Sequence, residues 1–333
     1  MSTTALNGHR QSITTVESAA FMAQLKKANE AKEAKEKPNA PPQNDSTTDT
    51  TTTTKDNSSK TTPNPFAFLL GEASRHHPKH AETWYHAVLS LFLGLLCSVG
   101  LGIYAVDNQW FTNIPELNIS STYDKYGYFL LSYQVIMLLC RAYIKGPEEL
   151  YNQLWACNAG MALATTGIIT HRPVMVGAAV GVVAIDQVLW YFDCLLRITT
   201  GKFRIGVAKY LDWPETPFIQ KLFSWHHLWF LPMCLYYLRE TGPGMPQGAL
   251  PLSVLGVFSM TLITRLVTPK DLNINMAFQF WVDIKIPFLH VMDEQSVFVY
   301  VPYILVVFNT INLPLWPLLV WAVGGYERVV VKK

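Results

Sequence analysis

The sequence predicts an all-α, polytopic integral membrane protein, in which a bundle of seven to eight helices follows a disordered N-terminal tail. Half of the 333 residues are hydrophobic and 15% are charged. The apolar residues lie almost entirely after about residue 83, in runs of roughly 20 residues that are long enough to cross a bilayer as helices. The residues before them are too polar to bury the surface that an ordered domain requires.

The chain divides into three predicted regions. A disordered tail covers residues 1–82 and contains a segment rich in Lys, Glu and Ala (AQLKKANEAKEAKEKPNA) and a threonine run (TTDTTTTTK). A polytopic transmembrane domain covers 83–325, and a short basic tail covers 326–333. The N-terminus lacks the short apolar run and small-residue cleavage site of a signal peptide, so we expect the first span to direct membrane insertion.

The apolar runs predict seven spans and one ambiguous segment. The seven spans are 84–105, 127–144, 151–170, 173–195, 222–238, 249–267 and 298–321. The segment 273–292 carries Asp283 and Lys285 at its middle, so it is either an eighth span or a re-entrant element. Lys and Arg crowd the tail, the 196–221 loop and the C-terminal end, and the positive-inside rule then predicts that both termini are cytoplasmic. Two termini on the same side require an even number of crossings, which favours eight spans. We expect an internal membrane, such as that of the endoplasmic reticulum.

Charge and cysteine content exclude several classes of function. The basic residues are spread over loops and form no stripe, so the sequence does not indicate a nucleic-acid partner. The five cysteines lie in or beside apolar runs and form no CxxC pair, which predicts free thiols rather than disulfides. They are Cys97, Cys140, Cys157, Cys194 and Cys234. Membrane lipids are the expected partners, and we expect no metal or other cofactor.

Two predicted spans carry chemically active residues at one shared depth. Cys157 lies about six residues into the span that starts near 151, and His227 lies about five residues into the span that starts near 222. At a helical rise of about 1.5 Å per residue, both lie roughly 8 to 9 Å below the cytoplasmic start of their helices. Polar groups at such depth are costly and therefore indicate a functional site.

Further polar residues belong to the same layer. Asp186 lies toward the cytoplasmic end of its span, and Asn273 and Asn275 lie in the stretch LNINMAF, near the cytoplasmic start of the ambiguous segment. Neighbouring residues on a helix point about 100° apart, so we expect one of His226 and His227 to face the thiol. The spacing of His227 to Pro232 favours His227.

This combination of side chains suits acyl transfer. An imidazole can take the proton of a nearby thiol, and the thiolate then attacks an acyl carbonyl. A third group fixes the tautomer of the histidine, and amide donors stabilise the oxyanion. The candidates are Cys157 as nucleophile, His227 as base with His226 as its neighbour, Asp186 or Asn273 as orienting group, and Asn158 or Asn275 as oxyanion donor.

Three short patches resemble a known family. The pattern HLWFLP, with His227 five residues before Pro232, resembles the androgen-induced-gene family of multi-span membrane hydrolases. The resemblance implies cleavage of fatty-acid esters of hydroxy fatty acids by an intramembrane threonine and a histidine. This chain has LWACNAG at the nucleophile position, which is similar to the related ether-phospholipid acyltransferases that use a cysteine with a histidine. LNINM is similar to an Asn-Leu-Asn segment late in those proteins.

The sequence of the 196–221 loop predicts a lid over the polar layer. Aromatic and aliphatic residues, among them Trp213, alternate there with basic ones, as in an interfacial amphipathic segment. We expect this loop to lie at the mouth of the polar layer, with Trp213 in contact with the ligand. An ordinary basic cytoplasmic loop is the alternative.

Two other interpretations of the polar layer stay open. Cys157, His226, His227 and Asp186 are all potential ligands of zinc or iron, although adjacent histidines do not readily chelate one ion from a regular helix. Intramembrane Asp, His and Asn also line transport pathways. The sequence shows no internal repeat of the kind common in transporters, and its polar residues gather on one side. A multi-span transporter or a structural membrane protein is therefore the alternative to an enzyme.

Overall fold

The computed structural model describes residues 84–110, 119–214, 216–241, 244–281, 284, 286–293 and 295–326. The described residues are helical or form turns, and they contain no β-strand beyond one isolated bridge between Met245 and Tyr326. The predicted tail over 1–82 and nearly all of the predicted tail over 326–333 lie outside the described residues. The all-α prediction is confirmed.

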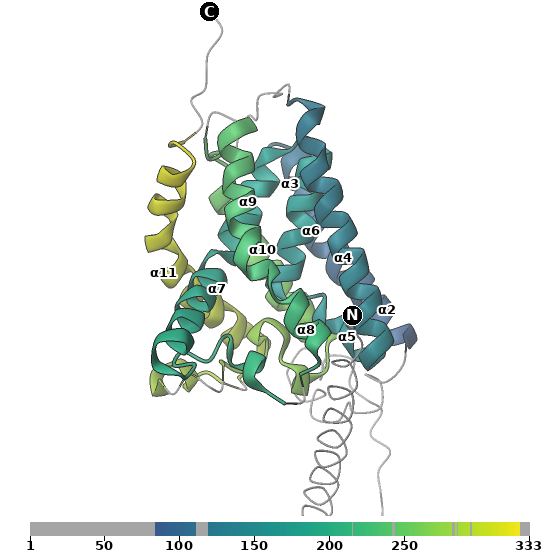
Figure 1. Ribbon diagram of the computed structural model, residues 1–333, viewed down its shortest axis with the longest axis vertical. Helices are drawn as coiled ribbons and strands as arrows, with labels where there is room; N and C mark the ends of the chain where they lie inside the picture. Colours follow the sequence, from purple (N-terminus) through teal and green to yellow (C-terminus); the bar gives the residue numbers. More distant parts are fainter. Residues whose placement is uncertain are drawn as a thin grey trace, which may run out of the picture. The chain divides into compact units, whose positions relative to one another are not determined.

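Figure 1 labels the α-helices of the described residues. Their bounds are α2 Trp84–Leu95, α3 Leu101–Asp107, α4 Asp124–Lys145, α5 Glu148–Asn152, α6 Ala156–Ile169, α7 Pro173–Thr200, α8 Phe218–Phe223, α9 His226–Thr241, α10 Ala249–Val267 and α11 Val297–Ala322. A π-helical turn over Leu96–Gly100 joins α2 to α3.

Five helical stretches are long and apolar enough to cross a membrane, which indicates an integral membrane protein. They are Trp84–Asp107, Ser121–Ile144, Pro173–Thr200, Ala249–Val267 and Val297–Ala322. Two further helices of the bundle, α6 and α9, have only 14 and 16 residues. A helix needs about 20 residues to cross the hydrocarbon core without help, so α6 and α9 are short for complete spans.

Helix α7 is the central helix of the bundle. It begins at Pro173, where the fixed φ of proline suits the first helical position, and it ends before Gly201, which adopts a left-handed φ of 75°. Its N-terminal half is buried against α6, α9 and α10. A Cβ atom on Gly181 would lie 2.6 Å from the Ser253 side chain, so this glycine allows α7 and α10 to approach closely.

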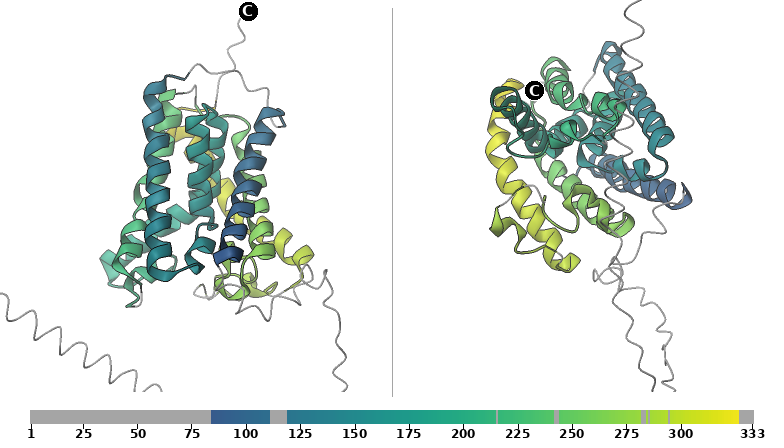
Figure 2. Two further views of the ribbon diagram at one scale, coloured as in Figure 1. Left: turned by 90° about the vertical axis from the view of Figure 1, so that its right-hand side faces the viewer. Right: turned by 60° about the horizontal axis from the view of Figure 1, so that its bottom comes forward.

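The described chain begins and ends at opposite ends of the bundle. The start of α2 contacts α5 at one end, whereas Gly325, after α11, accepts a hydrogen bond from Met245 in the α9–α10 connection at the other end. Figure 2 shows the helices running side by side between these ends. An even number of crossings, which the sequence favoured, is therefore not found within the described residues.

The segment 273–292 accounts for this difference. Where described, it forms short turns at the end of the bundle that holds α5 and α8 (Figure 1), and it does not cross the bundle. Asn273 and Asn275 adopt φ values of 43° and 55°, in the left-handed region that Asn tolerates better than most residues. Arg265 donates hydrogen bonds to the carbonyls of Ala277 and Gln295 and so fixes the turns to α10.

Two of the predicted spans are also interrupted. The predicted span 151–170 breaks after α5, because Trp155 is extended and α6 begins only at Ala156. The predicted span 222–238 breaks at Ser224, and α9 begins at His226. Polar side chains that bond to the main chain compete with helix continuation at both places. The Ser224 hydroxyl bonds to the Gln220 carbonyl, and Asn158 Nδ2 donates to the Asn152 carbonyl.

Candidate functional site

Two helix N-termini bring the thiol and the imidazoles together. Cys157 is the second residue of α6, and His226 and His227 are the first two residues of α9. The nearest ligand atoms of these three side chains lie within 4.8 Å of one another. The sequence predicted that at most one histidine would face Cys157 while the other met another partner. Both imidazoles lie near the thiol, and His226 also bonds to the Phe223 carbonyl.

The two histidines are held differently. His226 Nδ1 lies 2.7 Å from the Phe223 carbonyl oxygen, and a carbonyl can only accept, so Nδ1 carries the proton. His226 Nε2 is then an acceptor, and it is buried without a hydrogen-bond partner among the described residues. The ring centroids of His226 and His227 lie 4.2 Å apart.

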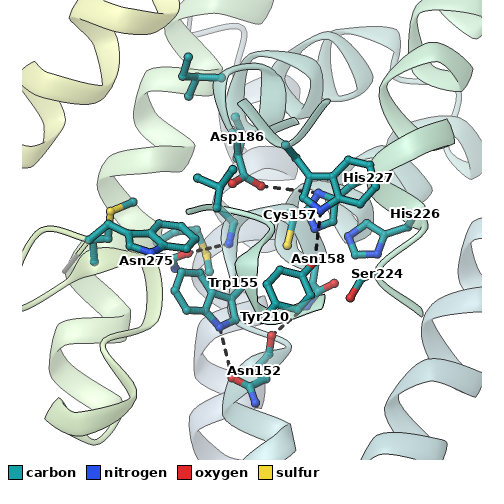
Figure 3. Close-up of a pocket in the computed structure, with 18 of the residues that line it drawn as sticks. Asn152, Trp155, Cys157, Asn158, Asp186, Tyr210, Ser224, His226, His227 and Asn275 are labelled. Atoms are coloured by element: carbon teal, nitrogen blue, oxygen red, sulfur yellow. Dashed lines mark hydrogen bonds and ion pairs between the residues drawn. The ribbon is translucent and has the colours of Figure 1, made fainter. Parts of the chain in front are cut away.

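His227 lies beside both the thiol and a carboxylate. Figure 3 shows Cys157, Asp186 and His227 grouped together, with a dashed line from Asp186 to His227. Its Nδ1 is 3.7 Å from Asp186 Oδ2, which is within ion-pair range but too long for a hydrogen bond. The Trp190 ring stacks on His227 with an interplanar angle of 20°. Asp186, His227 and Cys157 therefore lie close together, although no hydrogen bond joins His227 to Asp186.

The sulfur lies at the N-terminus of α6, where three main-chain N–H groups already have acceptors. The Ala156 N–H donates to Asn275 Oδ1, and the N–H groups of Asn158 and Ala159 donate to the Trp155 carbonyl. The partial positive charge of the helix N-terminus still favours an anion near Cys157. Because the site is buried, the thiol still depends on the adjacent imidazole to take its proton.

Asn275 positions the start of α6, which carries Cys157. Its Oδ1 accepts a hydrogen bond of 2.6 Å from the Ala156 N–H, and its Nδ2 donates to the Leu154 carbonyl at 2.7 Å. Both polar groups of this buried side chain therefore hold the start of α6, next to Cys157. This explains why the segment LNINM must lie beside LWACNAG, although the two are far apart in the chain.

The other predicted asparagines have mainly structural contacts. Asn273 Oδ1 accepts from the N–H groups of Phe278 and Gln279, and its Nδ2 donates to the Gln279 carbonyl. Asn273 does not line the cavity at the site. Asn158 lines it, but its Nδ2 donates to Asn152, and the atom without a partner is the acceptor Oδ1. In both residues an Nδ2 hydrogen is already used on a main-chain carbonyl, which makes them weaker candidates for the oxyanion donor.

A cavity of about 300 Å³ contains the site. Its lining comes from the helices α4 to α11 and from the connections after α5, α7, α8 and α10. The polar lining includes Arg141, Asn152, Gln220, Ser224 and His226, and the apolar lining includes Val182, Ile185, Val257, Met260, Met276 and Phe308. The size is at the lower limit for ligand pockets, so the cavity suits an ester and its neighbouring methylenes rather than a whole lipid.

The loop after α7 closes one side of this cavity. Val207, Tyr210 and Trp213 line it, as the predicted lid requires of Trp213. Asp193, which is fully buried, fixes this loop by accepting hydrogen bonds of 2.9 Å from the N–H groups of Ile205, Gly206 and Ala208. The loop is therefore tied to α7 by a carboxylate, and it is more than a basic connection.

Tyr210 is a candidate that sequence reasoning missed. Its hydroxyl accepts a hydrogen bond from Trp190 Nε1 at 3.3 Å and lies beside Ser224. Burial raises the pKa of Tyr210 to about 12, so the hydroxyl keeps its proton and can donate to a developing oxyanion. The loop sequence shows only one tyrosine among several aromatic residues, so its inward position could not be predicted.

Pro232 connects the site to α7. Proline has no N–H, so the Leu228 carbonyl loses its helical donor, and the Tyr191 hydroxyl donates to that carbonyl at 3.4 Å. Gln187 Oε1 accepts from the Leu231 N–H at 3.2 Å in the same region. These contacts fix α9 against α7, on which Asp186 lies.

The three side chains at the centre could also bind a metal ion. Thiolate and imidazole together suit zinc and other transition metals, and Asp186 beside His227 offers a fourth ligand or an outer partner. All five cysteines are free, as predicted.

No protein-family model, curated protein or solved structure matches this chain. The resemblance to the androgen-induced-gene family therefore remains a prediction from three motifs, and the function must be argued from the site itself.

Proposed function

We propose that the protein is an intramembrane acyltransferase or lipid-ester hydrolase with Cys157 as its nucleophile. The single observation that carries this proposal is the convergence of Cys157, His226 and His227 within 4.8 Å inside a cavity among apolar helices. A thiol beside an imidazole is a standard activated nucleophile for acyl groups. The apolar helices around it make a lipid ester the natural substrate.

The proposed reaction has two steps. His227 takes the thiol proton, and Cys157 attacks the ester carbonyl. The sulfur–carbon bond forms, the carbon–oxygen bond breaks, and the alcohol leaves with the proton from His227. A second hydroxyl, from an acceptor lipid or from water, then gives its proton to His227, attacks the thioester and releases the thiol. Tyr210 stabilises the oxyanion in both steps.

Packing supports an enclosed site over a transport pathway. The space around the N-terminal half of α7, toward the end of the bundle away from the cavity, is filled by close-packed apolar side chains. This core includes Val174, Met175, Val176, Ala178, Val180, Phe230 and Leu238. A solute pathway would need polar or water-filled space through this region, so we favour an enzyme over the transporter or structural alternative.

Acyl transfer in vesicles tests the proposal. The full chain is reconstituted with a diacyl phospholipid that carries isotope-labelled oleoyl groups and with a lysophospholipid acceptor, and products are followed by mass spectrometry. We expect labelled acceptor or labelled free oleate from the native protein, and a loss of roughly 10²-fold or more in Cys157→Ser and His227→Ala.

Cys194→Ser is the matched control, because Cys194 is another half-buried cysteine, on α7, that does not line the cavity. It should match the native protein. Equal rates in all four proteins would remove Cys157 from the chemistry.

Metal binding is the second candidate, since Cys157, His226 and His227 are also a potential ligand set. Elemental analysis of the purified protein separates the two. Stoichiometric zinc that is lost in both Cys157→Ala and His226→Ala would favour a metal centre. An acyl-transfer site needs no such metal.

A further inference from the structure

Arg141 is a buried cation without a counter-charge in the described part of the chain. It lies on α4, is 8% exposed and lines the cavity. Its guanidinium makes no hydrogen bond or ion pair with any described residue, and Nε is buried without a partner. An unpaired charge inside a protein is costly, so the buried guanidinium of Arg141 indicates that an anion binds beside it.

Arg141 does not extend to the membrane surface, as an arginine near a helix end usually does. It lies near the end of α4, where Leu139 and Tyr143 are 63% and 92% exposed and face away from the bundle. Arg141 instead faces inward and lines the cavity. Its direction is therefore not explained by contact with lipid head groups outside the bundle.

The surroundings of Arg141 favour a negative group next to the nucleophile. Arg141 is close enough to Cys157 and both histidines to act on them electrostatically. The N-termini of α6 and α9, which carry partial positive charge, meet at the same place. Asp186, the other charged residue of the described lining, lies 3.7 Å from His227 and forms no ion pair with Arg141.

We propose that Arg141 binds an anionic oxygen group, a phosphate or a carboxylate, of the lipid whose acyl ester lies at Cys157. A guanidinium offers a planar fork of donors that matches both groups with two parallel hydrogen bonds. Arg141 thereby selects charged over neutral lipids and sets the distance between the anionic group and the scissile carbonyl. The identification of the ligand as a lipid rests on the proposed function; the anion site does not.

Binding of three ligands with one oleoyl chain tests this inference. Oleoyl lysophosphatidate, oleate and monooleoylglycerol present a phosphate, a carboxylate and a neutral head group. The full-length protein is titrated with each in neutral detergent, and binding is followed by the fluorescence of the tryptophans that line the cavity, Trp155, Trp190, Trp213 and Trp281. We expect the native protein to bind at least one anion roughly 10- to 100-fold more tightly than the neutral ligand. The tighter anion identifies the group.

Variants connect the preference to Arg141. Arg141→Gln should lose the preference for the anion, and Arg141→Lys, which has a charge but no fork, should keep only part of it. Arg172→Gln is the charge-matched control, because Arg172 pairs with Asp107 outside the cavity, and it should behave as the native protein does. Titration in a Cys157→Ala background separates the anion site from acyl transfer, because binding there requires no chemistry.

Any of three results would overturn the inference. The first is that the native protein binds neither anion more tightly than monooleoylglycerol. The others are that Arg141→Gln or Arg141→Lys keeps the full preference for the anionic ligand. If Arg141→Gln does not fold, the inference is tested by the titrations of the native protein and of Arg141→Lys.

Discussion

The rings of His226 and His227 are adjacent, but their hydrogen bonds give them different roles. The Phe223 carbonyl fixes His226 and also accepts a hydrogen bond from the Tyr133 hydroxyl at 2.6 Å, so His226 connects α9 to α8 and α4. The His227 ring makes no such hydrogen bond with the described residues, and it lies near both Asp186 and Cys157. We assign catalysis to His227 and positioning to His226.

Substitutions separate these roles. His227→Ala should lower kcat by roughly 10²- to 10⁴-fold, the usual contribution of a general base. His226→Ala should reduce kcat less and should lower the melting temperature, because it removes a buried hydrogen bond. The comparison uses initial rates and thermal unfolding of the same preparations. A larger kcat loss in His226→Ala than in His227→Ala would reverse the assignment.

Tyr210 gives a second prediction at this scale. Tyr210→Phe keeps the ring and removes the proton that we assign to the oxyanion, so kcat should fall by roughly 10²-fold with little change in KM. Trp213→Phe also changes an aromatic side chain of the same loop and is the control; it should raise KM rather than lower kcat. If Tyr210→Phe changes only KM, the hydroxyl binds substrate and does not stabilise the oxyanion.

At the scale of elements, the site depends on connections that are not helical. The turns around Asn275 hold the start of α6, and the loop fixed by Asp193 closes the cavity. Asp193 lies on α7, the same helix as Asp186. A single rigid helix therefore positions the carboxylate beside His227 and the loop that covers it.

Release of the loop is measurable. Asp193→Ala leaves the N–H groups of Ile205, Gly206 and Ala208 without their acceptor, and hydrogen bonds to a charged group contribute about 1.5 to 3 kcal/mol each. We expect faster amide exchange over 203–213 and a higher KM.

The control for this variant is Asp212→Ala, which removes a carboxylate from the same loop. Asp212 forms an exposed ion pair with Arg197, and such pairs contribute about 0 to 1 kcal/mol. Asp212→Ala should leave exchange over 203–213 nearly unchanged. Equal exchange in the two variants would mean that Asp193 does not hold the loop.

On the scale of the whole molecule, the described chain starts at the end of the bundle that contains the site and finishes at the opposite end. Reporters of membrane sidedness placed in the α9–α10 connection and after residue 326 should therefore respond alike. A reporter in the loop after α7 should respond oppositely. If the reporters after residue 326 and after α7 agreed, the segment 273–292 would cross the membrane after all.

The sequence predicted the helical class and several helix bounds well, because long apolar runs have few other stable conformations in a membrane. The run 249–267 coincides with α10. The sequence could not predict the break before α6, since it depends on hydrogen bonds from the distant Asn275. The break before α9 depends on the local hydrogen bond from Ser224 to the Gln220 carbonyl, whose effect the apolar run concealed. The depth argument grouped Cys157, His227 and Asp186, which do lie close together. It placed Cys157 and His227 five to six residues inside their helices, and this was wrong, because both are the second residue of a helix. Arg141 and Tyr210 were missed because their inward direction follows from packing, not from spacing.

An acyl group trapped on Cys157 would test the central claim most directly. The native protein is mixed with vesicles that contain the labelled diacyl phospholipid and no acceptor, quenched in acid, digested, and analysed by mass spectrometry. We predict an oleoyl group on the peptide with Cys157, which neutral hydroxylamine removes as it does a thioester, and none on the peptide with Cys194. An unmodified Cys157 in a preparation that still transfers oleoyl groups would contradict the account.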